Sequence, residues 1–268
     1  MRKRLTQILT LLLFGSLSLS CMSANFGFHI HEDSRDQFVR VIQEAYITIC
    51  TDEGCVRNPL KSSGSGVVVS SSNRGSYILT AAHVCELEPE RIVPSPEYMD
   101  LVKQVEVNMS IVNLSQSEYK TKIISMDANS DLCLLYAEKY WNSAGPVRIS
   151  SAPAFEGERV YNVAAPVGIF YDNVVPLLEG FFMGTDGLRA YYSIPAMGGS
   201  SGSPIFNIRG DLIGMIHSVN VTFPIVSISP NHYELKKFIE TNVEAHKKQL
   251  EIKNKTLTYN LLYNILFN

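Results

Sequence analysis

Short apolar runs rich in β-branched residues recur along most of the chain. Serine, glycine or asparagine bounds most of these runs, and this rhythm predicts β-strands joined by turns. The runs lie at residues 46–49, 66–70, 76–79, 105–114, 120–126, 147–149, 159–164, 174–178, 188–193 and 212–218. Their number predicts an all-β fold of two six-stranded antiparallel β-barrels, and no internal repeat is evident in the sequence.

Two segments near the ends of the chain show helical spacing instead. Between Asp33 and Glu44, apolar residues lie among charges at roughly helical spacing, which predicts a short helix before the first strand. After Pro230 the same spacing returns and predicts a C-terminal helix. Residues 257–267 are apolar and aromatic, without charges, but a helix of this length is shorter than the ~20 residues that cross a bilayer. This tail is therefore expected to dock on the domain, a partner or a membrane surface.

The first residues have the pattern of an export signal. A basic start precedes an apolar stretch from Leu5 to Leu19, and small residues follow it. We expect a signal peptide over residues 1–20 with cleavage after Ser20, or with Ala24 as an alternative end, and a periplasmic or secreted protein. Cys21 resembles the acylated cysteine of bacterial lipoproteins, although the preceding leucine is one position away from its usual place. Lipidation of Cys21 and the apolar tail are two routes to membrane association.

Composition and charge describe one ordinary globular domain with small additions. The chain has 268 residues, of which 46% are hydrophobic and 18% charged, and a net charge of −3. Without a basic stripe, nucleic acid is not expected as a partner. We expect the signal peptide at 1–20, a lead with the short helix and first strand at 21–60, the main domain at 61–243 and the tail at 244–268.

Four cysteines remain when Cys21 is set aside. Cys50 and Cys55 flank a polar turn, so their pairing is local and expected. Cys85 and Cys133 are either a second disulfide or two free buried thiols. No close pair of cysteines or histidines suggests a metal site, and we expect neither a metal nor a cofactor.

The strongest candidate for a catalytic site is the run from Met197 to Pro204, MGGSSGSP. Glycines around a serine allow backbone conformations that expose the hydroxyl and let neighbouring N–H groups converge. A serine nucleophile needs a base and an acid that orients it. His83 ends the motif T-A-A-H after an apolar strand, and Asp131 opens the motif D-L-C-L-L. The order along the chain is histidine, aspartate, serine.

These three motifs resemble those of the trypsin-like (chymotrypsin-fold) serine peptidases. The stretches G-S-G-V-V-V at residues 64–69 and A-P-V-G at 165–168 are similar to the HtrA-type bacterial branch. The stretches after the serine resemble the last barrel strands of HtrA and of bacterial glutamyl endopeptidases. In all, the resemblance covers roughly residues 64–239. It implies a chymotrypsin-like pair of barrels and hydrolysis of protein or peptide substrates.

The resemblance also implies roles for single residues. Ser201 would be the nucleophile and His83 the general base, while Asp131 would hold the histidine tautomer. Backbone N–H groups of Gly199 and Ser201 would form the oxyanion hole. Ser200 stands where zymogen-type members carry aspartate, so activation by a new N-terminal ion pair is not expected.

Substrate specificity depends on loops and strand edges, and the candidate pocket residues are Pro195, Ile216, His217 and Val219. No acid precedes the nucleophile, which disfavours cleavage after lysine or arginine. Glutamyl endopeptidases place a histidine on the strand after the serine, but His217 lies one position later. In one interpretation it lines a pocket for glutamate. In the interpretation that we favour, it contacts Asp131, Ile216 faces the pocket, and the pocket is apolar.

Two functions are compatible with this sequence. The first is an exported serine endopeptidase that forms an acyl-enzyme on Ser201. The alternative is a catalytically silent peptidase fold that binds or anchors partners. The remaining histidines, at positions 29, 31, 232 and 246, are expected to face solvent.

Overall fold

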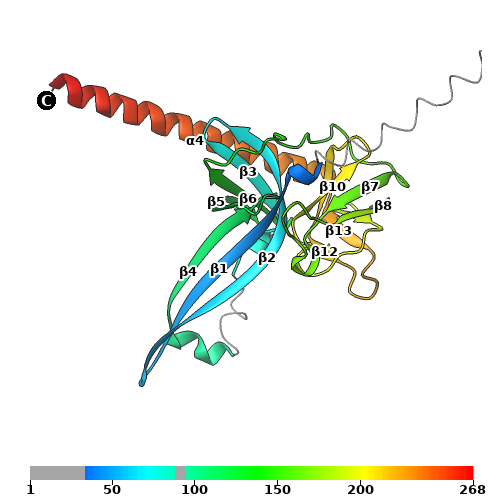
Figure 1. Cartoon of the computed structure of the whole chain (residues 1–268), viewed down its shortest axis with the longest axis horizontal. Coiled ribbons are helices and arrows are strands. Elements are labelled where there is room, and N and C mark those ends of the chain that lie inside the picture. Colours follow the sequence, from blue (N-terminus) through cyan, green and yellow to red (C-terminus); the bar gives the residue numbers. More distant parts are fainter. Residues whose placement is uncertain (1–33, 88–94, 268) are drawn as a thin grey trace, which may run out of the picture.

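The computed structural model describes residues 34–87 and 95–267, which form two antiparallel β-barrels and a long C-terminal helix (Figure 1). The predicted signal peptide, Cys21, His29 and His31 lie outside the described residues. The all-β fold class is confirmed.

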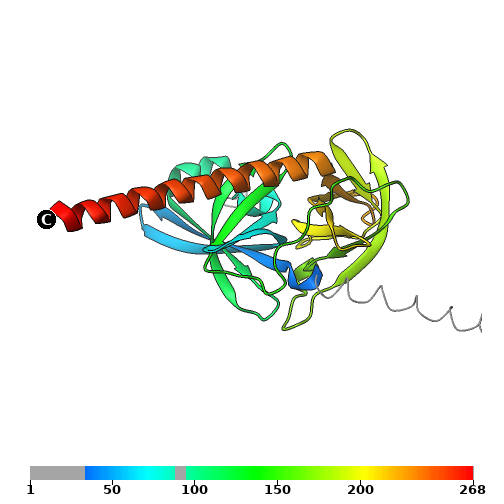
Figure 2. The same cartoon turned by 90° about the horizontal axis from the view of Figure 1, so that it is seen from above.

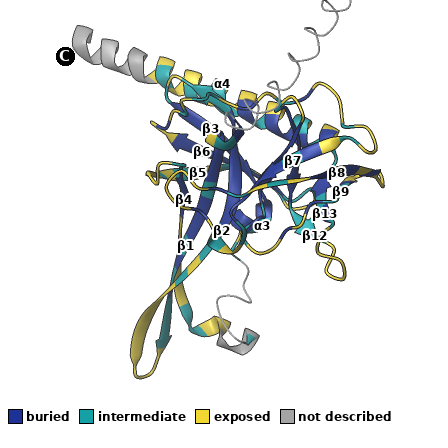
Figure 3. Ribbon diagram, turned by 45° about the vertical axis from the view of Figure 1, so that its right-hand side comes forward, coloured by how far each residue is buried: buried dark blue, intermediate teal, exposed yellow. Residues whose placement is uncertain are grey.

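The first barrel is closed and has six strands in the spatial order β1-β2-β3-β6-β5-β4. These strands are β1 (Phe38–Thr51), β2 (Gly54–Ser72), β3 (Gly75–Thr80), β4 (Val102–Val112), β5 (Glu118–Asp127) and β6 (Leu132–Glu138). Figure 1 shows β1 and β2 continuing beyond the barrel as a long hairpin with β4 beside it. The part of this hairpin near its tip is exposed (Figure 3).

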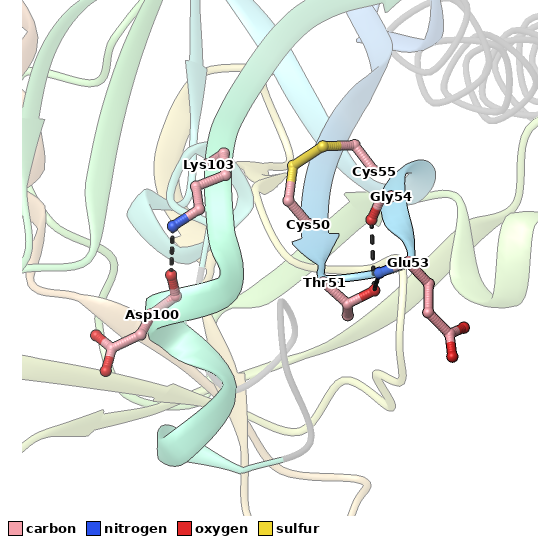
Figure 4. Close-up of a disulfide and its surroundings, with 7 residues drawn as sticks. All are labelled: Cys50, Thr51, Glu53, Gly54, Cys55, Asp100 and Lys103. Atoms are coloured by element: carbon pink, nitrogen blue, oxygen red, sulfur yellow. Dashed lines mark hydrogen bonds between the residues drawn. A yellow bond between two sulfur atoms is a disulfide. The ribbon is translucent and has the colours of Figure 1, made fainter.

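The predicted bond between Cys50 and Cys55 closes the tip of that hairpin, and we call it the hairpin disulfide (Figure 4). The two cysteines are also paired across the strands. Thr51 stabilises the turn, because its Oγ1 accepts a hydrogen bond from the N–H of Glu53 at 3.3 Å. The tip is therefore fixed covalently and by local hydrogen bonding.

The second barrel is a nearly closed sheet of seven strands in the order β11-β10-β7-β8-β9-β13-β12. These strands are β7 (Arg159–Val163), β8 (Leu177–Thr185), β9 (Arg189–Tyr192), β10 (Ser203–Asn207), β11 (Leu212–Ile216), β12 (Ser218–Val219) and β13 (Ser227–Pro230). The two edge strands are consecutive in the chain, with only His217 between them. The prediction of six strands did not separate β12 from β11.

Short helical segments and one long helix complete the fold. They are α3 (Ala82–Cys85), η2 (Pro96–Leu101), η3 (Pro166–Gly168) and α4 (His232–Phe267). Leu235, Phe238, Ile239 and Val243 of α4 join the larger hydrophobic core, most of which lies in the first barrel. Figure 2 shows α4 running across that barrel and beyond it. No helix in the described part of the chain is both long and apolar enough to be a membrane span.

The predicted helix between Asp33 and Glu44 is wrong. One helical turn at residues 34–36 is followed by β1, which begins at Phe38. Phe38, Val39 and Val41 are fully buried, so both faces of this strand are covered. A strand buried on both faces lacks the polar alternation that identifies strands, and its apolar spacing resembles a helix.

Other expectations also need correction. Residues 147–149 form no strand, only an isolated bridge from Ile149 to Leu212. His232 is 4% exposed, and burial lowers its pKa. His246 does not simply face solvent, because its Nδ1 lies 3.1 Å from the hydroxyl of Tyr77 on the first barrel.

Candidate active site

His83 and Asp131 meet at one end of the first barrel because β3 and β6 are neighbours. Thr80, the last residue of β3, pairs with Cys133 at the start of β6. His83 follows β3 on α3, and Asp131 directly precedes β6. A disulfide between Cys85 and Cys133 joins the same two segments, which resolves the alternative that the sequence left open. Two disulfides are typical of proteins that mature in an oxidising compartment.

Two hydrogen bonds hold His83 on the Asp131 carboxylate. The Nδ1 of His83 lies 2.7 Å from Oδ2 of Asp131, and the backbone N–H of His83 donates to Oδ1 at 2.9 Å. The backbone carbonyl of Asp131 also accepts a hydrogen bond from Ala82. Asp131 has a φ of 51°, in the left-handed region that aspartate tolerates better than most residues. The ring orientation of His83 is thus fixed through Nδ1, which leaves Nε2 for a reacting group.

The imidazole of His217 approaches the same carboxylate. Its Nδ1 lies 3.3 Å from Oδ2 of Asp131, and its side chain is 17% exposed. This is the contact described by the favoured interpretation of His217. Burial raises the pKa of Asp131, but hydrogen bonds from His217 and His83 outweigh it and hold this pKa well below its usual value. The carboxylate therefore stays ionised at neutral pH.

Ser201 lies in a turn in which the peptide groups that carry the N–H of Gly199 and the N–H of Ser201 have their carbonyls hydrogen-bonded elsewhere. The carbonyl of Gly198 accepts from Val167 N–H at 2.6 Å, and that of Ser200 accepts from Ser203 N–H at 3.0 Å. Gly199 has a φ of 95°, which suits glycine. Within the described residues, the N–H groups of Gly199 and Ser201 donate to no acceptor. Two such donors two residues apart are what an oxyanion hole requires.

Ser65 attaches this turn to the first barrel, a role that the sequence analysis did not identify. Its N–H donates to the carbonyl of Ser201 at 2.7 Å, and its Oγ donates to the carbonyl of Gly199. The same Oγ accepts from the N–H of Ala165 at 3.1 Å. Ser65 is fully buried. The only sequence signal was the small residue between two glycines in the G-S-G stretch.

His83, Gly199 and Ser201 line one cleft of about 420 Å³. The other residues that line it are Arg40, Ser62, Ser63, Val84, Val167, Gly168 and Gly198. The pocket candidates do not line this cleft. Pro195 is exposed, Ile216 is 1% exposed within the smaller hydrophobic core, and Val219 packs partly against that core.

Comparison with known proteins gives a family and a structure of similar fold. The model of the trypsin-like peptidase domain family matches residues 64–215, more than half of the chain. Among solved structures, the inactive form of a serine-to-alanine mutant of Rv3671c from M. tuberculosis H37Rv is similar in fold. Its TM-score is 0.55 at 13% sequence identity, over 81% of this chain and 91% of that chain. A comparison with curated proteins finds no match. The family match over residues 64–215, which include strands of both barrels, shows that this chain is a serine endopeptidase of the trypsin-like family.

Proposed function

We propose that the chain is an exported serine endopeptidase with the triad His83, Asp131 and Ser201. The observation that carries this proposal is that the Asp131-bound His83 lines the same cleft as Gly199 and Ser201, two residues whose amides donate to no acceptor within the described residues. A general base, a nucleophile and donors for a developing negative charge are the groups that acyl transfer needs.

In the proposed reaction, Ser201 Oγ bonds to the scissile carbonyl carbon while His83 Nε2 takes its proton. The carbonyl oxygen becomes an oxyanion and accepts hydrogen bonds from the amides of Gly199 and Ser201. His83 then protonates the leaving amine as the carbon–nitrogen bond breaks, which leaves an acyl-enzyme. A water molecule, deprotonated by His83, hydrolyses this ester. Ionised Asp131 stabilises the imidazolium in both steps.

We further propose an apolar pocket for the residue before the scissile bond. His217 lies against Asp131, so its imidazole is not placed to bind a glutamate side chain. Ile194, Ala196 and Ile216 are buried in the apolar core of the second barrel, and the pocket would have to open beside them. Together these positions favour small or medium aliphatic side chains over glutamate. Profiling with a peptide library tests this preference.

The decisive experiment on activity is labelling of purified protein with a fluorophosphonate, which reacts with activated serines. Wild type should be labelled and Ser201→Ala should not. Ser151→Ala is the matched control, because it removes an exposed serine that does not line the cleft. Absence of labelling in folded wild type would instead support the silent binding or anchoring protein.

Export is proposed from the basic and apolar N-terminal pattern together with the two disulfides. Intact-mass measurement of the mature protein should show loss of residues 1–20. Retention of Met1 on a cytosolic product would contradict export. An added diacylglycerol mass on Cys21 would establish a lipid anchor, which we propose as one route to the membrane, with the C-terminal tail as the other.

A further inference from the structure

Arg40 brings an unexpected charge to the active-site cleft. It lies on β1, where it pairs with Ser65 of β2, the residue that anchors the turn around Ser201. Of the described residues that line the cleft, Arg40 is the only one with a permanent charge. No carboxylate from residues 34–87 or 95–267 lines the cleft beside it. A lone guanidinium therefore faces the space next to the nucleophile.

The Arg40 guanidinium has fewer hydrogen-bond acceptors around it than it has donors. One Nη2 hydrogen bond reaches Ser63 Oγ at 3.3 Å. Nε is buried without a hydrogen-bond partner, and Arg40 makes no ion pair within the part of the chain that the structure describes. A buried donor without a partner is costly, and the planar guanidinium is shaped to take a carboxylate through two parallel bonds. The guanidinium therefore has unused donor capacity, which a carboxylate that approaches through the cleft would satisfy.

The position of Arg40 indicates which part of a substrate would reach it. The candidate pocket residues Pro195, Ile216, His217 and Val219, which we expect on the acyl side of the scissile bond, do not line the cleft. The cleft instead extends from Ser201 past Ser62, Ser63 and Gly168. A Cβ placed on Gly168 would lie 3.7 Å from Arg40 Nη2, so this glycine borders the guanidinium. The segment that leaves with the amine would occupy this side.

We propose that Arg40 forms a carboxylate subsite for the leaving-group side of the substrate. The carboxylate is either an aspartate or glutamate side chain shortly after the scissile bond or the free C-terminus of a short leaving segment. This inference rests on the proposed function. Together with the proposed apolar pocket, this subsite would make the enzyme selective for an aliphatic residue before the scissile bond and a negative charge after it.

The test compares peptides that share a valine before the scissile bond. One series carries Glu or Gln at the first, second or third position after that bond. A second series ends at these positions with a free or an amidated C-terminus. The readout is the ratio of kcat/KM for the charged over the neutral peptide within one enzyme preparation. This ratio is independent of how much of the enzyme is folded.

In wild type we expect a ratio of about 10 in at least one position, the usual scale of a charge-assisted hydrogen bond. Arg40→Gln should bring that ratio to about 1, and Arg40→Lys should retain part of it. Arg57→Gln is the matched control, because Arg57 pairs with Glu106 on the exposed hairpin and should leave the ratio unchanged. A preference in the first series identifies a side-chain carboxylate, and one confined to the second identifies the C-terminus.

Two results would overturn the subsite. One is a wild-type ratio near 1 at all positions of both series, and the other is a preference that survives Arg40→Gln. Labelling of wild type by the fluorophosphonate separates this failure from failure of the proposed function, because the probe has no peptide leaving segment. Labelled enzyme without carboxylate preference refutes only the subsite. Wild type that neither reacts with the probe nor cleaves any peptide refutes both.

Discussion

Substitution of His217 tests how the acid of the triad is held. His217 Nδ1 lies 3.3 Å from Asp131 Oδ2, the same oxygen that His83 approaches at 2.7 Å. Removal of His217 leaves Asp131 with both His83 contacts but takes away a donor from a partly buried carboxylate. We therefore expect His217→Ala to weaken catalysis without abolishing it, and to do so for all substrates alike.

The expected magnitude follows from the kind of bond. A hydrogen bond to a charged group contributes about 1.5–3 kcal/mol, and the 3.3 Å separation places this one at the lower end. About 1.5 kcal/mol corresponds to roughly a tenfold fall in kcat/KM. His217→Ser is the matched control. A hydroxyl at this position, as is usual in the family that the sequence resembles, can donate to Asp131 and should recover part of the loss.

The assay is kcat/KM on two peptides that differ only in valine or glutamate before the scissile bond. Both values should fall by the same factor in His217→Ala, because Asp131 acts on every substrate. A loss confined to the glutamate peptide would show that His217 lines the pocket. Preference of the wild type for glutamate would refute the reasoning in the same way.

Three further predictions follow from the contacts around the site. Ser65→Ala should lower kcat/KM well over tenfold and stability by about 2 kcal/mol in urea unfolding, because two buried backbone groups lose their partner. Ser76→Ala, which loses a buried bond to a carbonyl distant from the site, should cost similar stability but no activity. Replacing Cys85 and Cys133 by alanine opens a loop of 48 residues and should lower the free energy of unfolding by about 4 kcal/mol. Loss of the hairpin disulfide, which closes a much shorter loop, should lower it by about 2 kcal/mol. Thermal or urea unfolding measures both losses, and equal losses would contradict the dependence on loop length. The lowered folded-state pKa of Asp131 contributes stability that is present above its unfolded pKa of about 4 and is lost as pH falls through the folded value. Wild type should therefore lose stability relative to Asp131→Asn below about pH 4, and parallel acid unfolding curves would refute this.

The sequence located the triad candidates because each depends on its own short segment. His83 ends an apolar strand, Asp131 begins one, and glycines surround Ser201. The second disulfide could not be decided in this way, since it depends on the pairing of β3 with β6. Arg40 was missed for a similar reason. Its segment has helical spacing in the sequence, and only the burial of β1 on both faces makes it a strand beside the nucleophile.

The shape of the nucleophile turn depends on contacts between the two barrels. Gly202 has a φ of 87°, and a Cβ there would lie 2.0 Å from the carbonyl oxygen of Ser65 in the first barrel. Ser65 of the same barrel holds the carbonyls of Gly199 and Ser201, and the two peptide groups fixed in this way flank the Ser200–Ser201 peptide that carries the Ser201 N–H. Glycine in the sequence permits this turn but does not select its conformation. Contacts with β2 contribute to that selection, because they fix the peptide groups on both sides of the one that carries the Ser201 N–H.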